Sequence, residues 1–292
     1  IIVSLLRDPN NIEFLGCFLE ELEKTGYSLV IYTTAAKSGC LSDRELKHIT
    51  KKKVDGFILN ELNVMDRRLK DVLEKRDIPF VFYNGYYHMD SVTLDRAEGI
   101  RRVVKYLVEL GHRNFVYLCH PDISWHIKEE ASKIYGFKKG IEESGLSFRD
   151  DMIIEGWGTP EDGYDKTLQL LRKRIDLPTA LIYHNDLSAI GGITALAENG
   201  IGIPDDVSVV GFDNIPLSRY TSPPLTTIEQ PRGEIVKEVV RRIIKKIDNP
   251  EERFPVKVFT PELIIRNSTG PVRRKSYRGT KICGKKGVVI QS

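Results

Sequence analysis

The chain has 292 residues, of which 41% are hydrophobic and 29% charged, a composition typical of a globular protein large enough for two domains. No run approaches the roughly 20 apolar residues that a membrane-spanning helix needs, and no signal-peptide pattern opens the chain, so we expect a cytoplasmic protein. Seven Lys or Arg and no acid follow Gly270; subtracting them from the 44 bases leaves 37 against 41 acids, or −4, for residues 1–270. Residues 271–292 are a basic tail, either a solvated terminus or a segment that binds acidic partners.

Apolar runs alternate with amphipathic stretches along the first 212 residues. The apolar runs predict strands at residues 1–6, 28–33, 55–59, 79–83, 114–119, 152–155, 179–183 and 207–212. Helical spacing between them predicts helices at residues 14–25, 44–52, 66–75, 99–110, 130–144, 160–174 and 187–199. This alternation is typical of a parallel α/β fold.

Eight strands could close into one barrel or form two open sheets. The alternation stops after Phe212, where a Pro-rich passage at 215–224 leads into an extended segment at 225–228. A helix at 232–247 and an extended segment at 255–266 follow. Since a barrel needs no such ending, we expect two sheets.

Two of the predicted strands end in polar pairs, Asn185-Asp186 and Asp213-Asn214. In an open parallel sheet, small ligands bind beyond the carboxyl ends of the strands, which is where both pairs fall. The sequence therefore predicts a small-molecule pocket at this edge.

Signals for metal binding and catalysis are sparse. The four cysteines, Cys17, Cys40, Cys119 and Cys283, lack metal-ligand spacing, and a cluster of Cys119, His120 and His126 would lack a fourth ligand. No nucleophile elbow and no phosphate-binding glycine loop follows a strand. We expect no metal, no cofactor and no enzymatic activity.

Five motifs occur in order over residues 1–270. They are Val92-Thr-Leu-Asp95 with Gly99 and residues 106–113, Tyr135-Gly-Phe137, Asn185-Asp186 with residues 200–213, residues 224–231, and residues 261–266. Together they resemble the effector-binding core of the lactose-repressor (LacI/GalR) family of bacterial transcription regulators. The resemblance implies two doubly wound parallel-sheet subdomains, like those of periplasmic sugar-binding proteins, joined by three crossing strands around a ligand cleft.

The resemblance also suggests where the chain crosses between subdomains. We expect crossings near Cys119, near residues 227–230 and near residues 254–262. The N-terminal subdomain would then comprise residues 1–118 and 229–254, and the C-terminal subdomain residues 119–228 and 255–270. The basic tail lies outside the family pattern.

The function implied is that of a ligand-sensing, dimerising core that binds a small polar metabolite, a sugar or nucleoside, and allosterically controls DNA binding. The family's helix-turn-helix is absent from these residues, so operator DNA would be bound only through a missing N-terminal domain. Dimerisation would use helices of the N-terminal subdomain and residues 232–247. The alternatives are a solute-binding protein of a sugar transporter, or a sensor module fused to another output domain.

Two strand-end residues are the leading candidates for effector contacts. Asp213 lies where the resemblance places an acid that accepts hydrogen bonds from sugar hydroxyls; the alternative is that it caps its own turn. Asn185 offers a donor and an acceptor, and we expect its neighbour Asp186 to cap the following helix. Lys133 replaces the family's usual effector-binding arginine, so that either the effector differs or the contact is lost.

Further candidates carry an alternative structural role. Asp95 either contacts the effector or caps the helix after it. Asn10 and Asn11 follow the first strand, where relatives present pocket residues. Trp125 and Trp157 are predicted in loops at the cleft, as platforms for a sugar ring or base or as packing residues. Arg232 aligns near a pocket position, but we expect it to start a surface helix.

Overall fold

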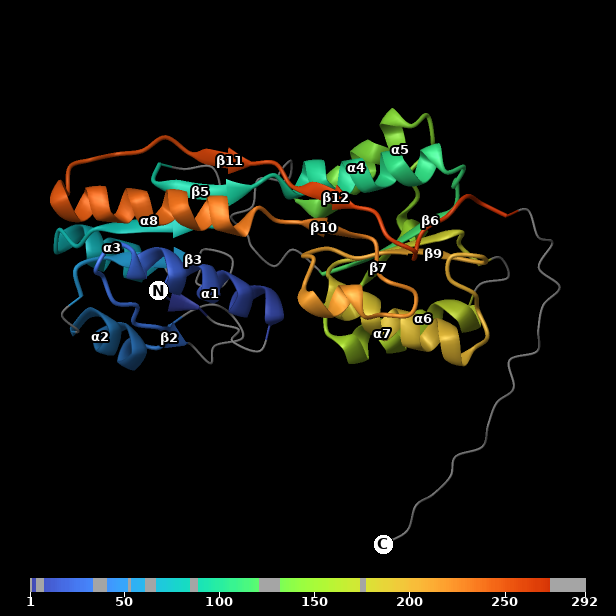
Figure 1. The fold of residues 1–292 in the computed structure, drawn as a ribbon, viewed down its shortest axis with the longest axis horizontal. Coiled ribbons are helices and arrows are strands. Elements are labelled where there is room, and N and C mark those ends of the chain that lie inside the picture. Colours follow the sequence, from blue (N-terminus) through green and yellow to red (C-terminus); the bar gives the residue numbers. More distant parts are fainter. Residues whose placement is uncertain are drawn as a thin grey trace, which may run out of the picture.

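The protein consists of two α/β lobes lying side by side, with extended segments running between them (Figure 1). The structure is a computed structural model. It describes residues 2–3, 8–33, 41–51, 54–60, 67–84, 89–120, 132–173 and 177–273. No helix within these ranges is long and apolar enough to cross a membrane.

The N-terminal lobe is built on a parallel sheet whose described strands have the order β11-β5-β4-β3-β1-β2. The strands are β1 (Ile2–Val3), β2 (Tyr32–Thr33), β3 (Phe57–Asn60), β4 (Phe80–Tyr83), β5 (Ser91–Leu94) and β11 (Lys257–Phe259). The helices are α1 (Pro9–Glu23), α2 (Asp43–Lys51), α3 (Arg67–Lys75) and α8 (Arg232–Asp248).

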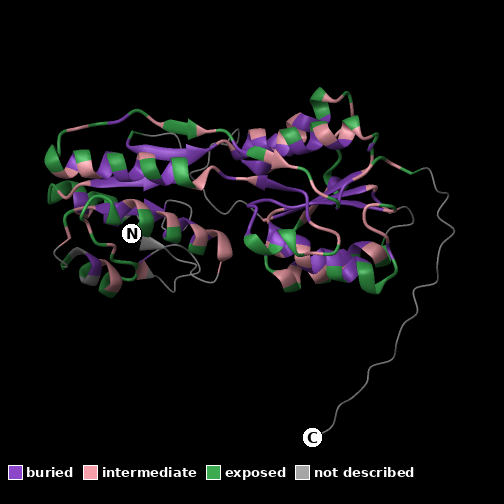
Figure 2. Ribbon diagram, viewed as in Figure 1, coloured by how far each residue is buried: buried purple, intermediate pink, exposed green. Residues whose placement is uncertain are grey.

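Both faces of this sheet are covered. Phe57 and Leu59 of β3 join the hydrophobic core beneath α2 and α3, whereas Ile58 between them joins the core beneath α1 and α8. Successive side chains of a strand point to opposite faces, so a strand buried on both faces is apolar throughout. Figure 2 shows the inner strands β4 and β5 as buried, whereas the edge strand β11 is exposed.

The C-terminal lobe has a second parallel sheet, of described order β7-β6-β8-β9. Its strands are β6 (Phe115–Cys119), β7 (Ile153–Glu155), β8 (Ala180–Tyr183) and β9 (Ser208–Val210). Helices α4 (Arg96–Glu109) and α5 (Lys133–Glu143) lie on one side of the sheet, and α6 (Pro160–Lys173) and α7 (Asp186–Glu198) on the other (Figure 1). Short 3₁₀ helices span Asp150–Met152 and Pro216–Arg219.

Two antiparallel strands join the lobes. β10 (Thr227–Glu229) pairs with β12 (Glu262–Ile264), with Thr227 opposite Ile264. An isolated bridge between Asp213 and Glu229 attaches β10 to the segment after β9. The chain also crosses earlier, at Asp95, through a short link between β5 in the N-terminal sheet and α4 on the C-terminal one.

The strand pairing differs from the expected division of the chain in two places. β6 pairs with β7 and β8, so Cys119 lies within the C-terminal sheet and the first crossing occurs at Asp95. The last crossing follows Phe259, within the expected range 254–262, but β11 pairs with β5, so residues 257–259 belong to the N-terminal sheet and not to the C-terminal subdomain. The first boundary was misplaced because β5 was not predicted as a strand: its buried Ser91 and Thr93 are polar and interrupt the apolar run that marks the other strands.

Candidate functional site

Polar residues from both lobes converge where the carboxyl ends of the two sheets face the crossing strands. We call Asp8, Asn10, Lys133, Asn185, Asp213 and Arg232 the interdomain site. Asp8 precedes α1 of the N-terminal lobe, yet its carboxyl interacts electrostatically with Lys133 of the C-terminal lobe. Asp213 interacts with Lys133, Asp8 and Arg232. Asp8 is half-buried, and this burial raises the pKa of its carboxyl.

Asp213 occupies a constrained position at the end of β9. Its φ of 110° lies in the left-handed region, and its N–H donates to the carbonyl of Ile228 at 2.9 Å. One carboxylate oxygen accepts a 2.6 Å hydrogen bond from Nε2 of Gln230. Burial raises the pKa of Asp213 to about 6, although Lys133 lowers it. The side chain is therefore fixed by the crossing strand, as an effector contact requires, and its role as one stays a prediction.

Lys133 is buried at the start of α5. Its Nζ donates to the carbonyl oxygen of His184 at 2.7 Å and lies 3.6 Å from the centroid of the Phe212 ring. Ser132 caps the helix by accepting from the N–H of Tyr135. A buried ammonium at a helix N-terminus needs acidic neighbours, and Asp8 and Asp213 provide them.

The cap of α7 is Asn185, not Asp186 as expected. Oδ1 of Asn185 accepts from the N–H of Ser188 at 2.9 Å, completing a capping box. Asp186 is instead fully buried, accepting from Oγ1 of Thr227 at 2.5 Å and from the N–H of Ile215 at 2.9 Å. Since the cap uses Oδ1, an effector would contact the amide nitrogen of Asn185.

The start of α1 lies beside Arg232. Asp8 caps the helix by accepting from the N–H of Asn10, and Oδ1 of Asn10 accepts from Nε of Arg232 at 3.1 Å. Asn11 is buried with Phe14 on the inner face of α1. Arg232 does begin α8, but it is not a surface residue: its side chain is only 11% exposed. The predicted surface position is thus part of the site.

Asp95 has the capping role that was one of its two predicted alternatives. Its carboxylate accepts from the N–H of Glu98 at 2.9 Å. The next residue, Arg96, is buried and donates to Oδ1 of Asn84 at 2.9 Å, and Nδ2 of Asn84 lies 3.5 Å from Oδ1 of Asn60. Asp95 and Arg96 therefore secure the first crossing.

An aromatic cluster lies at the carboxyl ends of β6 and β8. The rings of His120 and His184 have centroids 5.4 Å apart, and Trp157 packs edge-on against His120 at 5.4 Å. Burial lowers the pKa of His184 well below its usual range, and Lys133 adds to this effect, so its ring is neutral. Trp157 is 64% exposed, as a platform for a ligand requires. Trp125 and His126 lie outside the described residues.

Sequence reasoning missed four polar residues of this region. Asn60 and Asn84 each stand at or just after the last residue of a strand, so the strand-end rule that found Asn185 and Asp213 would have found them. Asp8 was identifiable as a cap before Pro9. Gln230 gave no local signal, because its role depends on the distant Asp213.

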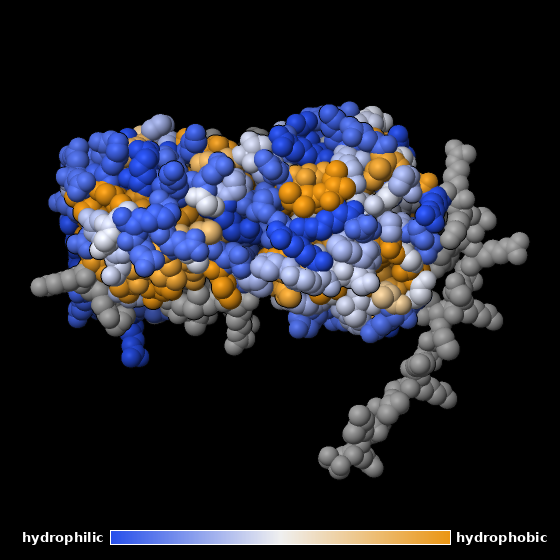
Figure 3. Space-filling view, viewed as in Figure 1, coloured by the Kyte–Doolittle hydropathy of each residue, from blue (hydrophilic) through white to orange (hydrophobic). Residues whose placement is uncertain are grey.

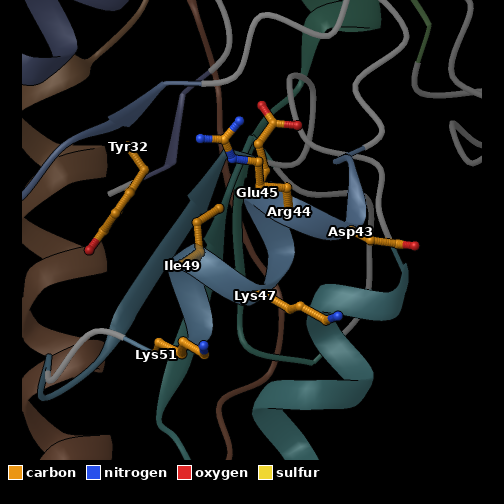
Figure 4. Close-up of a pocket in the computed structure, with 7 residues that line it drawn as sticks. All are labelled: Tyr32, Asp43, Arg44, Glu45, Lys47, Ile49 and Lys51. Atoms are coloured by element: carbon orange, nitrogen blue, oxygen red, sulfur yellow. The ribbon is translucent and has the colours of Figure 1, made fainter.

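A separate hollow of about 780 Å³ lies beside β2 and α2. Figure 4 shows its lining residues, Tyr32, Asp43, Arg44, Glu45, Lys47, Ile49 and Lys51. The charged side chains there belong to exposed or half-buried residues, and none of the predicted site residues takes part. The junction between the lobes, by contrast, is hydrophilic on the face shown in Figure 3. We therefore place the candidate site between the lobes.

Comparisons with known proteins agree with the fold. A family model described as a periplasmic binding protein-like domain matches residues 104–269. The HTH-type transcriptional repressor PurR of Histophilus somni is 31% identical over 273 residues, which cover 92% of this chain and 80% of the repressor. The PurR repressor of Pasteurella multocida is 31% identical over 271 residues, with the same coverage.

Solved structures of regulators superpose on almost the whole chain. A LacI family transcriptional regulator from Enterococcus faecium with bound ribose has a TM-score of 0.80 and 26% identity, covering 93% of this chain and 98% of its own. The Escherichia coli transcriptional repressor ascG has a TM-score of 0.77 and 25% identity, covering 92% and 97%. With the fold, these matches show that the chain belongs to the LacI/GalR family and is the ligand-sensing core of a transcriptional regulator.

Proposed function

We propose that the chain binds a small polar effector, a sugar or a nucleoside, at the interdomain site, and that binding changes the relative position of the lobes. Hinge closure about crossing strands is the motion that this architecture favours. In the intact regulator, the N-terminal lobes would then reposition DNA-binding units on an operator. The protein would act by binding rather than catalysis, in the cytoplasm.

The convergence of Asp8, Lys133 and Asp213 between the lobes is the observation that carries this proposal. A carboxylate on each wall can accept hydrogen bonds from hydroxyl groups at two edges of one ligand. Trp157, which packs against His120 in the aromatic cluster, offers an exposed indole ring. A related regulator holds ribose, which supports a polyol as the class of ligand.

Titration calorimetry with a panel of pentoses, hexoses, disaccharides and nucleosides tests the proposal. We expect one ligand per chain, with Asp213→Ala weakening affinity by at least about tenfold, because a hydrogen bond to a charged group contributes about 1.5–3 kcal/mol. Asn185→Ser retains a capping hydroxyl but removes the amide nitrogen, so it tests ligand contact separately from helix stability. Asp165→Ala, at an exposed position of α6, is the matched control.

If Asp213→Ala and Asn185→Ser bind the identified ligand as tightly as the unaltered chain, the interdomain site is not the effector site. The same conclusion follows if Asp165→Ala weakens binding as much as Asp213→Ala does.

We also propose that the chain dimerises through the N-terminal lobe. Ile12 and Leu19 of α1 are each 52% exposed and lie two turns apart on one face of the helix. The exposed residues of α8, by contrast, are polar or glycine. Light scattering at high concentration should give twice the mass of the chain. The mass measured for Leu19→Glu should be lower. A monomeric mass would contradict dimerisation.

A further inference from the structure

Arg232 makes side-chain contacts with both lobes and with the strand that crosses between them. Nε donates to Oδ1 of Asn10 at 3.1 Å, and Nη1 forms a 2.9 Å ion pair with Glu229 at the end of β10. Nη2 donates to the main-chain carbonyl oxygen of Asp213. The guanidinium lies 5.9 Å from the ring centroid of Phe14, also on α1. One buried side chain thus contacts α1, β10 and the end of β9.

Gln230, two residues before Arg232, also binds Asp213. Gln230 donates to the carboxylate of Asp213 at 2.6 Å, while Arg232 donates to its carbonyl. The N–H of Arg232 in turn donates to the carbonyl of Gln230 at 2.7 Å. Main chain and side chain of Asp213 are therefore both held by the segment that joins β10 to α8.

The network continues into the second crossing strand. Nδ2 of Asn214 donates to Oε2 of Glu229, and Oδ1 of Asn214 accepts from Nη2 of Arg266 at 2.5 Å. Arg266 follows β12 and also donates to the carbonyl of Leu225 at 2.6 Å. A hydrogen-bonded chain thus runs from Arg266 through Asn214, Glu229 and Arg232 to Asn10 on α1.

We propose that Arg232 is a positioning residue for the effector site: it ties Asn10 on one wall to Asp213 on the other, so that the walls hold a defined relation before an effector binds. This rests on the proposed function only in treating Asn10 and Asp213 as effector contacts. Arginine suits the role because its planar fork donates in three directions at once. A lysine could retain the ion pair with Glu229 but not all three contacts.

Hydrogen exchange of the ligand-free chain, followed by mass spectrometry, tests the proposal. In Arg232→Gln, we expect exchange to accelerate by roughly tenfold or more in both residues 9–15 and residues 213–218, as for the loss of one or two hydrogen bonds. Exchange in α6 and α7 should not change. Exchange in Arg232→Lys should be intermediate between that of the unaltered chain and that of Arg232→Gln. Arg241→Gln, which removes an exposed ion pair on the same helix, should change exchange in neither segment.

A second variant keeps the proposal testable if Arg232→Gln misfolds. Asn10→Ala removes one acceptor of Arg232 and touches nothing at the end of β9, yet it should accelerate exchange in residues 213–218. The proposal is overturned if Arg232→Gln accelerates exchange in only one of the two segments, in neither of them, or equally in all segments of the chain. It is also overturned if Asn10→Ala leaves exchange in residues 213–218 unchanged. Because no effector is added, these outcomes do not depend on the calorimetry.

Discussion

Asp186 is an acid buried at the first turn of α7, behind the interdomain site. Its two oxygens accept from Oγ1 of Thr227 and the N–H of Ile215, which fasten the crossing strand and the 215–218 segment to the C-terminal lobe. Burial and, secondarily, the negative charge of Asp213 raise its pKa from an ordinary value of 3.8 to about 8. This carboxyl therefore holds a proton in the folded protein at neutral pH.

The raised pKa of Asp186 predicts a pH-dependent stability. Between pH 4 and pH 8 the folded protein binds a proton that the unfolded chain releases, so the contribution of Asp186 to stability falls as pH rises. We expect the free energy of unfolding of the unaltered chain, relative to that of Asp186→Asn, to fall by up to about 1.4 kcal/mol per pH unit. Urea unfolding of both proteins from pH 5 to pH 8 measures this difference. A difference independent of pH would show that Asp186 is ionised in the folded state.

The exchange of roles between Asn185 and Asp186 shows what sequence reasoning can and cannot resolve for single residues. A polar pair at a strand end indicates that one residue caps the helix and the other points elsewhere. Which residue does so depends on Thr227 and Ile215, about 30 or more positions away. Arg232 illustrates the same limit, because its burial is due to Asn10 and Asp213, to which no local pattern connects it.

Among the secondary structure elements, the helices were predicted best. Amphipathic spacing identified α1 to α8, with errors mainly at their starts, as at α1, which begins at Pro9 because Asp8 caps it. β5 was missed, because its buried Ser91 and Thr93 interrupt the apolar run by which the other strands were recognised. Without β5, the crossing could not be placed at Asp95.

Close packing of α4 against α5 depends on Gly136. A Cβ at this position would lie 2.1 Å from the carbonyl oxygen of Ala97, which is main chain and cannot rotate away. We expect Gly136→Ala to lower the free energy of unfolding by about 1–3 kcal/mol, the usual range for overpacking. Gly16→Ala is the matched control: α1 has open space there, so alanine should stabilise by up to about 1 kcal/mol through helix propensity.

Thermal and urea unfolding of both glycine variants would check this pair of expectations. Equal effects of the two substitutions would mean that the helices separate readily, and that Gly136 has no packing role.

At the scale of the whole molecule, the two sheets direct their carboxyl ends toward one polar region. The sequence indicated two such sheets because the alternation of strands and helices ended in a segment that a barrel would not need. It did not indicate how the lobes share the chain, since strand order depends on pairing between distant residues such as Val258 and Thr93. The proposed sensor would therefore take its ligand contacts from two lobes joined by crossing strands.

An effector that binds between the lobes should leave a hydrogen-exchange footprint on both of them. The sugar or nucleoside that calorimetry identifies should be added at saturation, and exchange compared with that of the free chain. We predict slower exchange in segments from both lobes, residues 9–15 of the N-terminal lobe and residues 132–136 and 211–218 of the C-terminal lobe. Protection confined to one lobe, or to residues 41–51 beside the separate hollow, would contradict the account.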